Sequence, residues 1–460
     1  MRVTRPAALA RIAALSLLVL APCFWHSRIH AGDLSSHAYN AWLAGQVEQR
    51  PVPGLTVVPQ YSNVLFDLML SSAMRTCNAG NAQRIVVAAC VLIFFWGSFA
   101  FVSAMAGGFA WWIAPCLAML SYGYVFHMGF FNYYLSLGLC LFAVAAWLTG
   151  RTTLRAIGLV LLAIAWTAHS LPVVWAIGVL IAMRLAERFP RAFFPAGAAA
   201  LVAMHFVITT HYRNSWGWDQ RGLISGTDQF ALFGPAYRTV ATCALVLAFP
   251  IVWLRSRRFG AATLIGSPES QVLGLLALAV LVIPSGIALG DYQVPLEFLP
   301  QRLSLTVALV ACVVMAGGPV ARWQAAGCWI LMAAYGIVLY DAVTAKVSAL
   351  KPGQRVIVAS AMPVWRVDLL THIVDRACIG HCFSYANYEP CTLAFRLRAT
   401  GKNDLVTADC DVSLAIKGGT YIVKADDPAF VQVNICPGDR VVLTRIDPGQ
   451  LAGHPRCTTE

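Results

Sequence analysis

Long apolar stretches joined by short polar connections run through the first 345 residues of this 460-residue chain. Hydrophobic residues make up 59% of the sequence and charged residues 12%, whereas soluble domains carry about 25% charged residues. A helix satisfies its own backbone hydrogen bonds, so such stretches can cross a bilayer. The sequence therefore predicts an α-helical polytopic membrane protein with about eleven transmembrane helices, near residues 7–24, 84–105, 109–126, 131–148, 156–167, 173–186, 193–210, 240–253, 272–289, 303–315 and 324–340.

Arginine residues set the orientation that we expect for these spans. They cluster beside the apolar stretches at the N-terminus and at residues 151–155, 184–191, 255–258 and 322. Positive flanking residues stay in the cytoplasm. The N-terminus is therefore expected inside and the C-terminal tail outside, in a multi-pass protein of the plasma (inner) membrane. These flanks also account for the net charge of +12, and no aromatic-interleaved basic patch points to nucleic acid.

Two features leave the nature of some spans open. The first apolar stretch is also compatible with a cleaved signal peptide, after which residue 26 onward would still emerge outside. The fifth and sixth stretches are short, and a hinge at Pro172 is compatible with a re-entrant pair. Because this pair enters and leaves on one side, later segments keep their orientation.

The tail has a composition of its own. Residues 351–460 are expected to form a small α+β or β-rich extracytoplasmic domain, beside a transmembrane domain of residues 1–345. Strand patterns occupy residues 356–360, 420–424, 430–434 and 441–446, and a helix pattern occupies residues 367–377.

Six of the fourteen cysteines lie in this tail, at Cys378, Cys382, Cys391, Cys410, Cys436 and Cys457. An even, dense set in a polar domain outside the cytoplasm favours disulfides. A zinc site is the alternative, because Cys378, His381 and Cys382 have a spacing that suits ligation.

The loop of residues 26–82 carries the residues on which our functional hypothesis is built. It places Asp33 just beyond the first span, and His37 follows four residues later, on the same face of a helix. The pattern from Leu34 to Glu48 predicts an amphipathic helix in the membrane interface, with a polar face that includes Ser35, Asn40, Gln46 and Glu48.

A second interfacial helix is expected at Val58–Met74, with Asn63 and Asp67 one turn apart on a single face. On such a helix, the ordinary place for an acid is the face in contact with water. A role for Asp67 in a site is the alternative.

Polar side chains gather on the external side in this topology: Asp33, His37, Asp67, His127, Asn132, His169, Asp219, Asp291, Glu297 and Arg302. Ionisable groups at a membrane are functional hypotheses by default. Structural alternatives exist, because Asp33 can cap a helix and a histidine at a helix end can cap or snorkel. Arg302 begins a span on the external side, where a guanidinium either snorkels or holds a lipid phosphate.

A metal site is a further alternative. His26, His30, Asp33 and His37 would line one face if the whole stretch were helical, but Gly32 opposes a continuous helix. No phosphate-binding loop, nucleophile elbow with a matching triad or dinucleotide fingerprint is present. The sequence therefore assigns no metal ligand and no certain cofactor, and it leaves a divalent metal open.

The order of these features resembles the GT-C class of integral-membrane glycosyltransferases, such as protein mannosyltransferases and oligosaccharyltransferase catalytic subunits. The shared order is one span, a long external first loop with an acid near its start, about ten further spans and an external C-terminal domain. The resemblance covers roughly residues 1–340 and rests on Asp33 in GDLSSH, on Asp67 as a looser second acid, and on FLPQR at Phe298–Arg302. The paired acids of many such enzymes are missing.

The resemblance implies transfer of a sugar from a polyprenyl-phosphate donor to a hydroxyl of a glycan, lipid or protein acceptor at the membrane lipid surface. A carboxylate would take the proton of the acceptor. The hypothesis assigns catalytic roles to Asp33, His37 and Asp67. It assigns donor or substrate binding to His127, Asn132, His169 and Arg302. The alternatives are a non-catalytic membrane scaffold, a lipid or polysaccharide transporter, and a polysaccharide polymerase.

Overall fold

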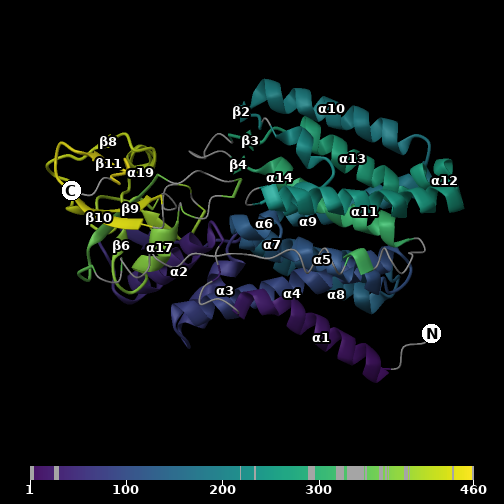
Figure 1. The fold of residues 1–460 in the computed structure, drawn as a ribbon, viewed down its shortest axis with the longest axis horizontal. Coiled ribbons are helices and arrows are strands. Elements are labelled where there is room, and N and C mark those ends of the chain that lie inside the picture. Colours follow the sequence, from purple (N-terminus) through teal and green to yellow (C-terminus); the bar gives the residue numbers. More distant parts are fainter. Residues whose placement is uncertain are drawn as a thin grey trace. The chain divides into compact units, whose positions relative to one another are not determined.

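The computed structural model describes residues 5–24, 29, 31–217, 219–232, 235–288, 296–317, 326–328, 347, 350–361, 366–367, 370, 372–387, 392, 394–437 and 440–457. The chain divides into two compact units (Figure 1). Unit 1 comprises Met1–Pro22, Ala88–Phe126 and Tyr133–Ile337, and unit 2 comprises Cys23–Val87, His127–Asn132 and Val338–Glu460. The first loop therefore groups with the tail. A single domain boundary near residue 345, as predicted from the sequence, does not describe this grouping.

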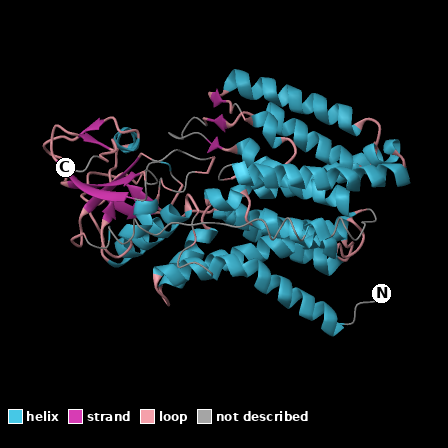
Figure 2. Cartoon of the chain, in the orientation of Figure 1, coloured by secondary structure: helices cyan, strands magenta, loops and turns pink. Residues whose placement is uncertain are grey.

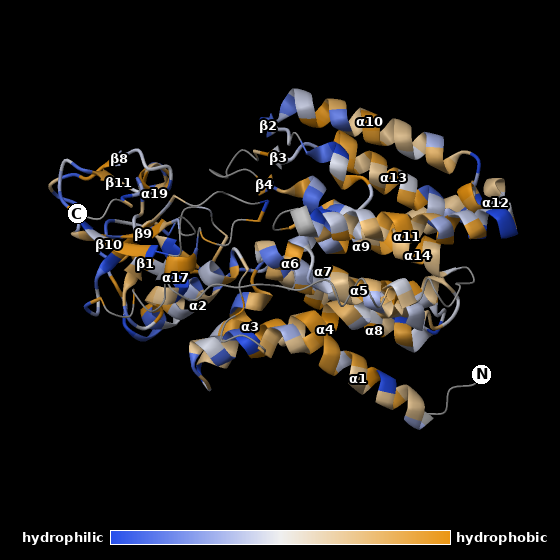
Figure 3. Ribbon diagram, in the orientation of Figure 1, coloured by the Kyte–Doolittle hydropathy of each residue, from blue (hydrophilic) through white to orange (hydrophobic). Residues whose placement is uncertain are grey.

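Seven helices in the described part of the chain are long and apolar enough to cross a membrane (Figures 2 and 3). They are α1 (Arg5–Phe24), α4 (Ala79–Met105), α7 (Phe131–Leu148), α9 (Ser170–Arg188), α10 (Phe193–His211), α11 (Pro235–Phe259) and α14 (Leu299–Ala316). Shorter apolar helices are α3 (Leu65–Met74), α8 (Thr152–Ala168) and α13 (Pro268–Val282). The chain is thus a helical protein with the features of a membrane protein.

Four of the eleven expected spans are not among these seven helices. Those at residues 156–167 and 272–289 correspond to the shorter helices α8 and α13. The stretch at residues 109–126 is broken into η1 (Trp111–Ile113), α5 (Ala114–Ser121) and α6 (Tyr124–Met128). The stretch at residues 324–340 lies outside the described residues except for residues 326–328. The total of eleven spans therefore stays a prediction.

The surface of α10 is apolar and open. Only 6% of its apolar stretch is buried, and Val202, Phe206 and Val207 are all exposed. An apolar helix with this exposure is stable in lipid, where its side chains lose no water contacts and its backbone is satisfied internally. Exposed apolar surfaces of this kind occur where a protein meets a membrane or another protein.

Helices α4 and α7 cross closely in unit 1 because glycines face each other. A Cβ on Gly97 would lie 2.4 Å from the carbonyl oxygen of Gly138, and a Cβ on Gly138 would lie 2.8 Å from the Cα of Phe94. Small residues allow helix backbones to approach and so increase van der Waals packing, which drives association of helices in lipid.

The tail contains a four-stranded sheet in unit 2. Its strands, in the order β10-β9-β5-β6, are β10 (Arg440–Ile446), β9 (Phe430–Cys436), β5 (Arg355–Ser360) and β6 (Phe383–Ser384). β9 pairs antiparallel with β10 and parallel with β5. The strand predictions at residues 356–360, 430–434 and 441–446 are therefore confirmed. The pattern at residues 420–424 forms only the short β8 (Tyr421–Ile422), which pairs with β11 (Leu451–Ala452).

The first loop is built into unit 2 with the tail. Strand β1 (Leu55–Val57) pairs antiparallel with β7 (Leu397–Ala399). Helix α2 (Leu34–Gln49) shares a hydrophobic core with the tail, to which Tyr39 and Leu43 contribute from α2. Segments from opposite ends of the chain thus bury a common core.

Helix α2 differs from the amphipathic helix that its sequence predicts. Gln46 and Glu48 are exposed as expected, but Ser35 and Asn40 are buried, at 4% and 2% exposure. Asn40 is satisfied inside the protein, because its amide nitrogen donates to Ser36 O and its amide oxygen accepts from Asn387. The expected water-facing role of Ser35 and Asn40 is therefore wrong.

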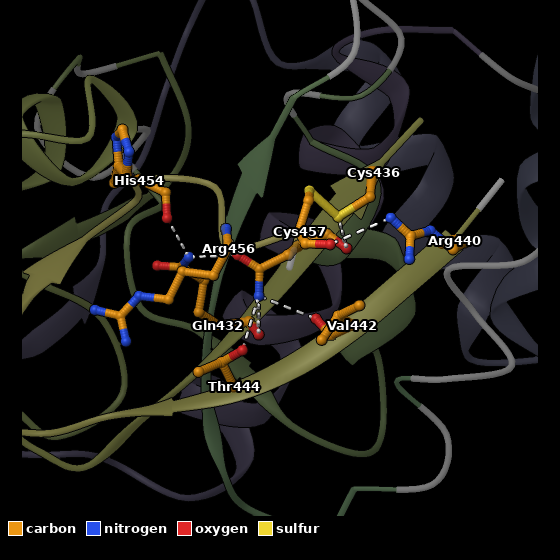
Figure 4. The surroundings of a disulfide bond; sticks show 9 residues. Gln432, Cys436, Arg440, Val442, Thr444, His454, Arg456 and Cys457 are labelled. Carbon is orange, nitrogen blue, oxygen red and sulfur yellow. Dashed lines mark hydrogen bonds between the residues drawn. A yellow bond between two sulfur atoms is a disulfide. The ribbon is translucent and has the colours of Figure 1, made fainter. Parts of the chain in front are cut away.

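Disulfides link cysteines of the tail. Cys378 bonds to Cys382 at the end of α17 (Ile373–Cys378), and Cys436 bonds to Cys457. Around the second disulfide, Arg440 donates a hydrogen bond to Cys457 O at 3.2 Å (Figure 4). The cysteines of the alternative zinc site are thus bonded to each other.

Cys410 is also disulfide-bonded, and Cys391 lies outside the described residues. The helix expected at residues 367–377 is shorter than predicted, since the described helix α17 begins at Ile373.

In a digest of protein isolated without reductant, Cys378 and Cys382 should be joined within a single peptide, and Cys436 should be joined to Cys457. Mass spectrometry of a non-reduced digest measures this. Cys77 and Cys243, which are free, should react with a thiol reagent in the same unfolded sample. Alkylation of Cys378, Cys382, Cys436 and Cys457 without prior reduction would contradict these disulfides.

Candidate functional site

Main-chain hydrogen bonds from the end of α6 fix the start of α2 within unit 2. Gly32 N donates to His127 O at 2.8 Å, and Asp33 N donates to Met128 O at 2.9 Å. Gly129 has a φ of +82°, and a Cβ there would lie 2.5 Å from Asp33 N. Only glycine permits both this conformation and this approach. Asp33 is therefore held by a tight turn that is distant in sequence.

The side chain of Asp33 does not serve as a helix cap. Asp33 occupies the N-cap position of α2, with φ −74° and ψ −9°, and makes no side-chain capping hydrogen bond. The structure thus contradicts the capping alternative. Its side chain is 30% exposed, and its Oδ1 lies 3.7 Å from Nε2 of His372. A partly accessible carboxylate beside an imidazole suits proton transfer.

His372 is buried and oriented by a chain of polar groups. Its Nδ1 lies 2.9 Å from Oδ2 of Asp375, whose Oδ1 accepts a hydrogen bond from the Ser384 hydroxyl. The Ser384 amide in turn donates to the Tyr39 hydroxyl at 3.0 Å. Burial raises the pKa of Tyr39, and the charge of Asp375 acts in the same direction. Tyr39 therefore stays a neutral phenol.

A second pair of histidine and carboxylate involves the first turn of α2. His37 Nδ1 is 2.7 Å from Asp67 Oδ1, and the side chains are 8% and 7% exposed. The His37 ring contacts Phe66 and Phe395 edge-on, with ring centroids 5.4 Å and 4.9 Å away. Asp67 is therefore buried, and the alternative in which it faces water is wrong.

Asn132 holds Asp67 and the start of α3. Its amide nitrogen donates to Asp67 Oδ2 at 2.8 Å and to Asn63 O at 3.1 Å, and its oxygen accepts from Phe66 N at 2.9 Å. Both N–H groups are thus engaged within unit 2. These contacts give Asn132 a positioning role, whereas its assignment to donor binding stays a prediction.

Helix α3 begins at Leu65, seven residues later than the predicted helix. Asn63 lies before it with a φ of +56°. The expected helical spacing of Asn63 and Asp67 is therefore wrong, although both residues contact Asn132. Asn63 also donates to Ala394 O at 3.3 Å, which ties this segment to the tail.

His127 lies in unit 2 and is buried, with 1% exposure. Its carbonyl oxygen accepts from Gly32 N, so its backbone helps to hold the start of α2. The structure thus gathers five of the seven predicted site residues in unit 2, namely Asp33, His37, Asp67, His127 and Asn132.

The other two predicted site residues, His169 and Arg302, belong to unit 1. His169 Nδ1 accepts from Leu171 N at 3.1 Å and so caps the start of α9. Burial lowers the pKa of His169 to about 3, and the charge of Arg302 acts in the same direction. His169 is therefore neutral at physiological pH, with its proton on Nε2 when Nδ1 accepts.

Arg302 and His169 both contact the ring of Tyr133. The guanidinium carbon of Arg302 lies 5.6 Å from the ring centroid, and the His169 ring meets it edge-on at 5.6 Å. The Tyr133 hydroxyl donates to Arg302 O at 3.1 Å. Partial desolvation raises the pKa of Glu297, while the charge of Arg302 opposes this shift. A cation and a neutral N–H donor suit an anionic ligand.

Other sequence candidates have less defined places. Asp219 lies in unit 1, in the polar loop after α10. Asp291 lies outside the described residues, as do His26 and His30 of the alternative metal face. Within the residues that the structure describes, no group of three or more histidine, cysteine or acidic side chains could hold a metal ion.

No family model, curated protein or solved structure matches this chain.

Sequence reasoning missed His372 and Asp375. They lie in a helix-like run of the tail, VDLLTHIVDRA, where they resemble ordinary polar residues of a surface helix. Their spacing of three residues was a local signal for a side-chain contact. No local signal connects this pair to Asp33.

Gly129→Ala should destabilise unit 2 more than Gly353→Ala does. Both glycines have a positive φ, +82° and +81°, but nothing lies within 4 Å of a Cβ on Gly353. Gly353→Ala should therefore cost about 1 kcal/mol of backbone strain. Gly129→Ala should cost a further ~2 kcal/mol, because the added methyl group meets the Asp33 backbone. Unfolding in detergent measures both, and equal losses would contradict the close approach.

Asp67→Ala should lower the free energy of unfolding by about 3 kcal/mol, because it removes the buried carboxylate to which His37 Nδ1 and one N–H of Asn132 are bonded. Asp426→Ala is the control. Asp426 pairs with Lys402 at 3.4 Å at the surface, where both side chains are more than two-thirds exposed (75% and 78%). It should lose nothing measurable. If the two variants have the same free energy of unfolding, the buried pair of His37 and Asp67 does not stabilise the protein.

Proposed function

We propose that this chain is a membrane glycosyltransferase that moves a sugar from a polyprenyl-phosphate donor to a hydroxyl of a glycan, lipid or protein acceptor. One observation carries the proposal. The carboxylate of Asp33 is not used as a helix cap, is 30% exposed, and lies 3.7 Å from a buried histidine. The resemblance of the sequence order to GT-C enzymes supports the same acid as the group that acts on the acceptor.

The chemistry needs one base and one stabilised leaving group. As the acceptor oxygen bonds to the anomeric carbon, Asp33 takes the hydroxyl proton. The bond from the anomeric carbon to the phosphate oxygen breaks, and the lipid phosphate leaves as an anion. A site that excludes water protects the donor from hydrolysis. This reaction needs no redox cofactor.

Unit 1 has features that suit a polyprenyl-phosphate donor. Arg302 and His169 offer a cation and a neutral donor group for a phosphate. An apolar cavity of about 230 Å³ lies among α5, η3 (Thr227–Phe230), α11 and α14. Ile113, Phe230, Ile251 and Met315 are among its lining residues. Such a cavity suits an isoprenoid chain, because burying it removes apolar surface from water.

The proposal includes the finer topology of about eleven spans. The N-terminus is cytoplasmic and the tail is extracytoplasmic in the plasma (inner) membrane. The arginine clusters support this orientation. The disulfides of the tail support an oxidising compartment, since disulfides persist outside the cytoplasm.

The alternative functions, a transporter, a polymerase and a scaffold, predict different properties for the same residues. A transporter needs polar groups near the bilayer midplane, whereas Asp33 lies beyond the first apolar helix, in unit 2. A polymerase would also use a lipid-linked donor, so the identity of the product separates it from the proposal. A non-catalytic scaffold would not depend on the charge of Asp33.

Asp33→Asn should lower sugar transfer by about 100-fold or more, the usual scale of a lost general base. The measurement is transfer from labelled polyprenyl-phosphate hexoses and pentoses to octyl glycosides in membranes, normalised to folded protein. Asp33→Ala should lose as much activity. Full activity in the Asn variant would remove Asp33 as the base, and Asp67 would become the acid to test.

Asp409 supplies the matched control for stability. It is the N-cap of α19 (Cys410–Lys417), and its side chain accepts from Asp411 N and Val412 N. Asp409→Ala should therefore lose about 1 kcal/mol of stability and keep transfer activity. Asp33→Ala should show the opposite pattern, because its side chain caps nothing. If Asp33→Ala instead behaves like Asp409→Ala in both measurements, Asp33 is structural.

A further inference from the structure

The imidazole next to Asp33 comes from the far end of the chain. Nε2 of His372 lies 3.7 Å from Asp33 Oδ1, and the His372 side chain is 4% exposed against 30% for Asp33. Both residues belong to unit 2. Asp33 is thus the accessible member of the pair, and His372 is the buried member.

Asp375 determines which nitrogen of His372 faces Asp33. Nδ1 of His372 lies 2.9 Å from Asp375 Oδ2, so a carboxylate there accepts the Nδ1 proton. Nε2 then carries the lone pair and points toward Asp33. Asp375 is itself held by the hydroxyl of Ser384. A carboxylate that orients an imidazole in this way fixes its tautomer and stabilises the protonated ring.

The histidine of α2, His37, is enclosed by different groups. His37 bonds to Asp67, and its ring lies against Phe66 and Phe395. Its side chain and that of Asp67 are at most 8% exposed. His37 therefore supports the packing around the site, whereas His372 is the imidazole that adjoins the accessible acid.

We propose that His372 shares the proton that Asp33 takes from the acceptor hydroxyl, and that Asp375 positions His372 for this task. The inference rests on the proposed glycosyl transfer. The acceptor proton moves to Asp33 as the acceptor oxygen bonds to the anomeric carbon. The new carboxyl O–H then turns to Nε2 and passes the proton to it, which restores the Asp33 carboxylate. The imidazolium later releases the proton to water.

The distance explains the order of these steps. At 3.7 Å, Asp33 and His372 form no hydrogen bond in the resting state. A proton on the Asp33 carboxylate supplies the donor that is missing, so the contact can shorten once the acceptor has been deprotonated. Among the residues that the structure describes, Asp33 from the start of α2 and Asp375 from α17 place carboxylates beside the His372 ring. Two carboxylates therefore flank the transient cation.

The first test is the effect of His372→Gln on transfer kinetics. The variant should lower kcat by about 10- to 100-fold and leave KM unchanged, because the residue handles a proton and does not hold substrate. Asp375→Asn should lower kcat similarly, since an amide cannot stabilise the same tautomer and charge. The substrates are a labelled polyprenyl-phosphate hexose or pentose and an octyl glycoside.

A double variant separates this role from a structural one. If His372 acts through Asp33, then His372→Gln should cause less than a twofold further loss in an Asp33→Asn background, because the shared step is already gone. Independent effects that multiply would contradict the proposal. The free energy of unfolding of each single variant is measured in detergent. If it equals that of the wild type, the loss of activity does not come from a loss of folded protein.

Chemical rescue of kcat by an added base distinguishes a role in proton transfer from a role in packing. In His372→Gly, added imidazole should restore at least a fifth of the lost kcat, because it fills the space and accepts a proton. Pyrazole has nearly the same shape but is a much weaker base, and it should restore nothing. Rescue by both compounds, or by neither, would contradict a proton-sharing role.

His381→Gln is the matched control, since His381 lies in the same tail, between the disulfide partners Cys378 and Cys382. It should keep wild-type kcat. If Asp33→Asn abolishes transfer but His372→Gln keeps full activity, only the inference about His372 fails. If Asp33→Asn is fully active, or wild-type protein transfers no sugar, the proposed function fails and this inference fails with it.

Discussion

The burial of a polar helix is the constraint on which the rest of unit 2 depends. The first half of α2 carries Ser36, His37 and Asn40, and all three are buried. Burying such groups without partners costs several kcal/mol in total. Their partners come from α3 and from the tail, as in the bonds from His37 to Asp67 and from Asn387 to Asn40. The first loop and the tail therefore depend on each other to fold.

This mutual dependence gives the acid at the start of α2 its surroundings. Backbone bonds from the end of α6 hold Asp33 in place, and the Gly129 turn lets them form. The carboxylate itself makes no capping bond, so its charge is not used for helix stability. The pair of His372 and Asp375 then adds an oriented imidazole next to it. An accessible acid in a rigid, polar and mostly buried frame is what general base chemistry requires.

Local sequence patterns predicted a large part of the secondary structure. They could not predict contacts between residues that are far apart in the sequence. Hydropathy located seven apolar helices, and alternation located β5, β9 and β10, because both signals are contained in short windows. The sequence also singled out Asp33 and Asp67 as acids of interest. It could not say that Asp67 binds His37 rather than water, or that a tail histidine adjoins Asp33. Such contacts join residues far apart, as Tyr39 and Ser384 do across 345 positions, and leave no local signature.

The most direct test of the account is a cross-link between the first loop and the tail. Thr56 in β1 faces Arg398 in β7 in the antiparallel register, and facing residues in such a pair are close enough for a disulfide. Thr56→Cys combined with Arg398→Cys should therefore form an intramolecular disulfide in native membranes, while Thr56→Cys combined with Thr407→Cys should not. Failure of the first pair to cross-link within one chain, or equal cross-linking of both pairs, would contradict the claim that the two ends of the chain build the Asp33 site together.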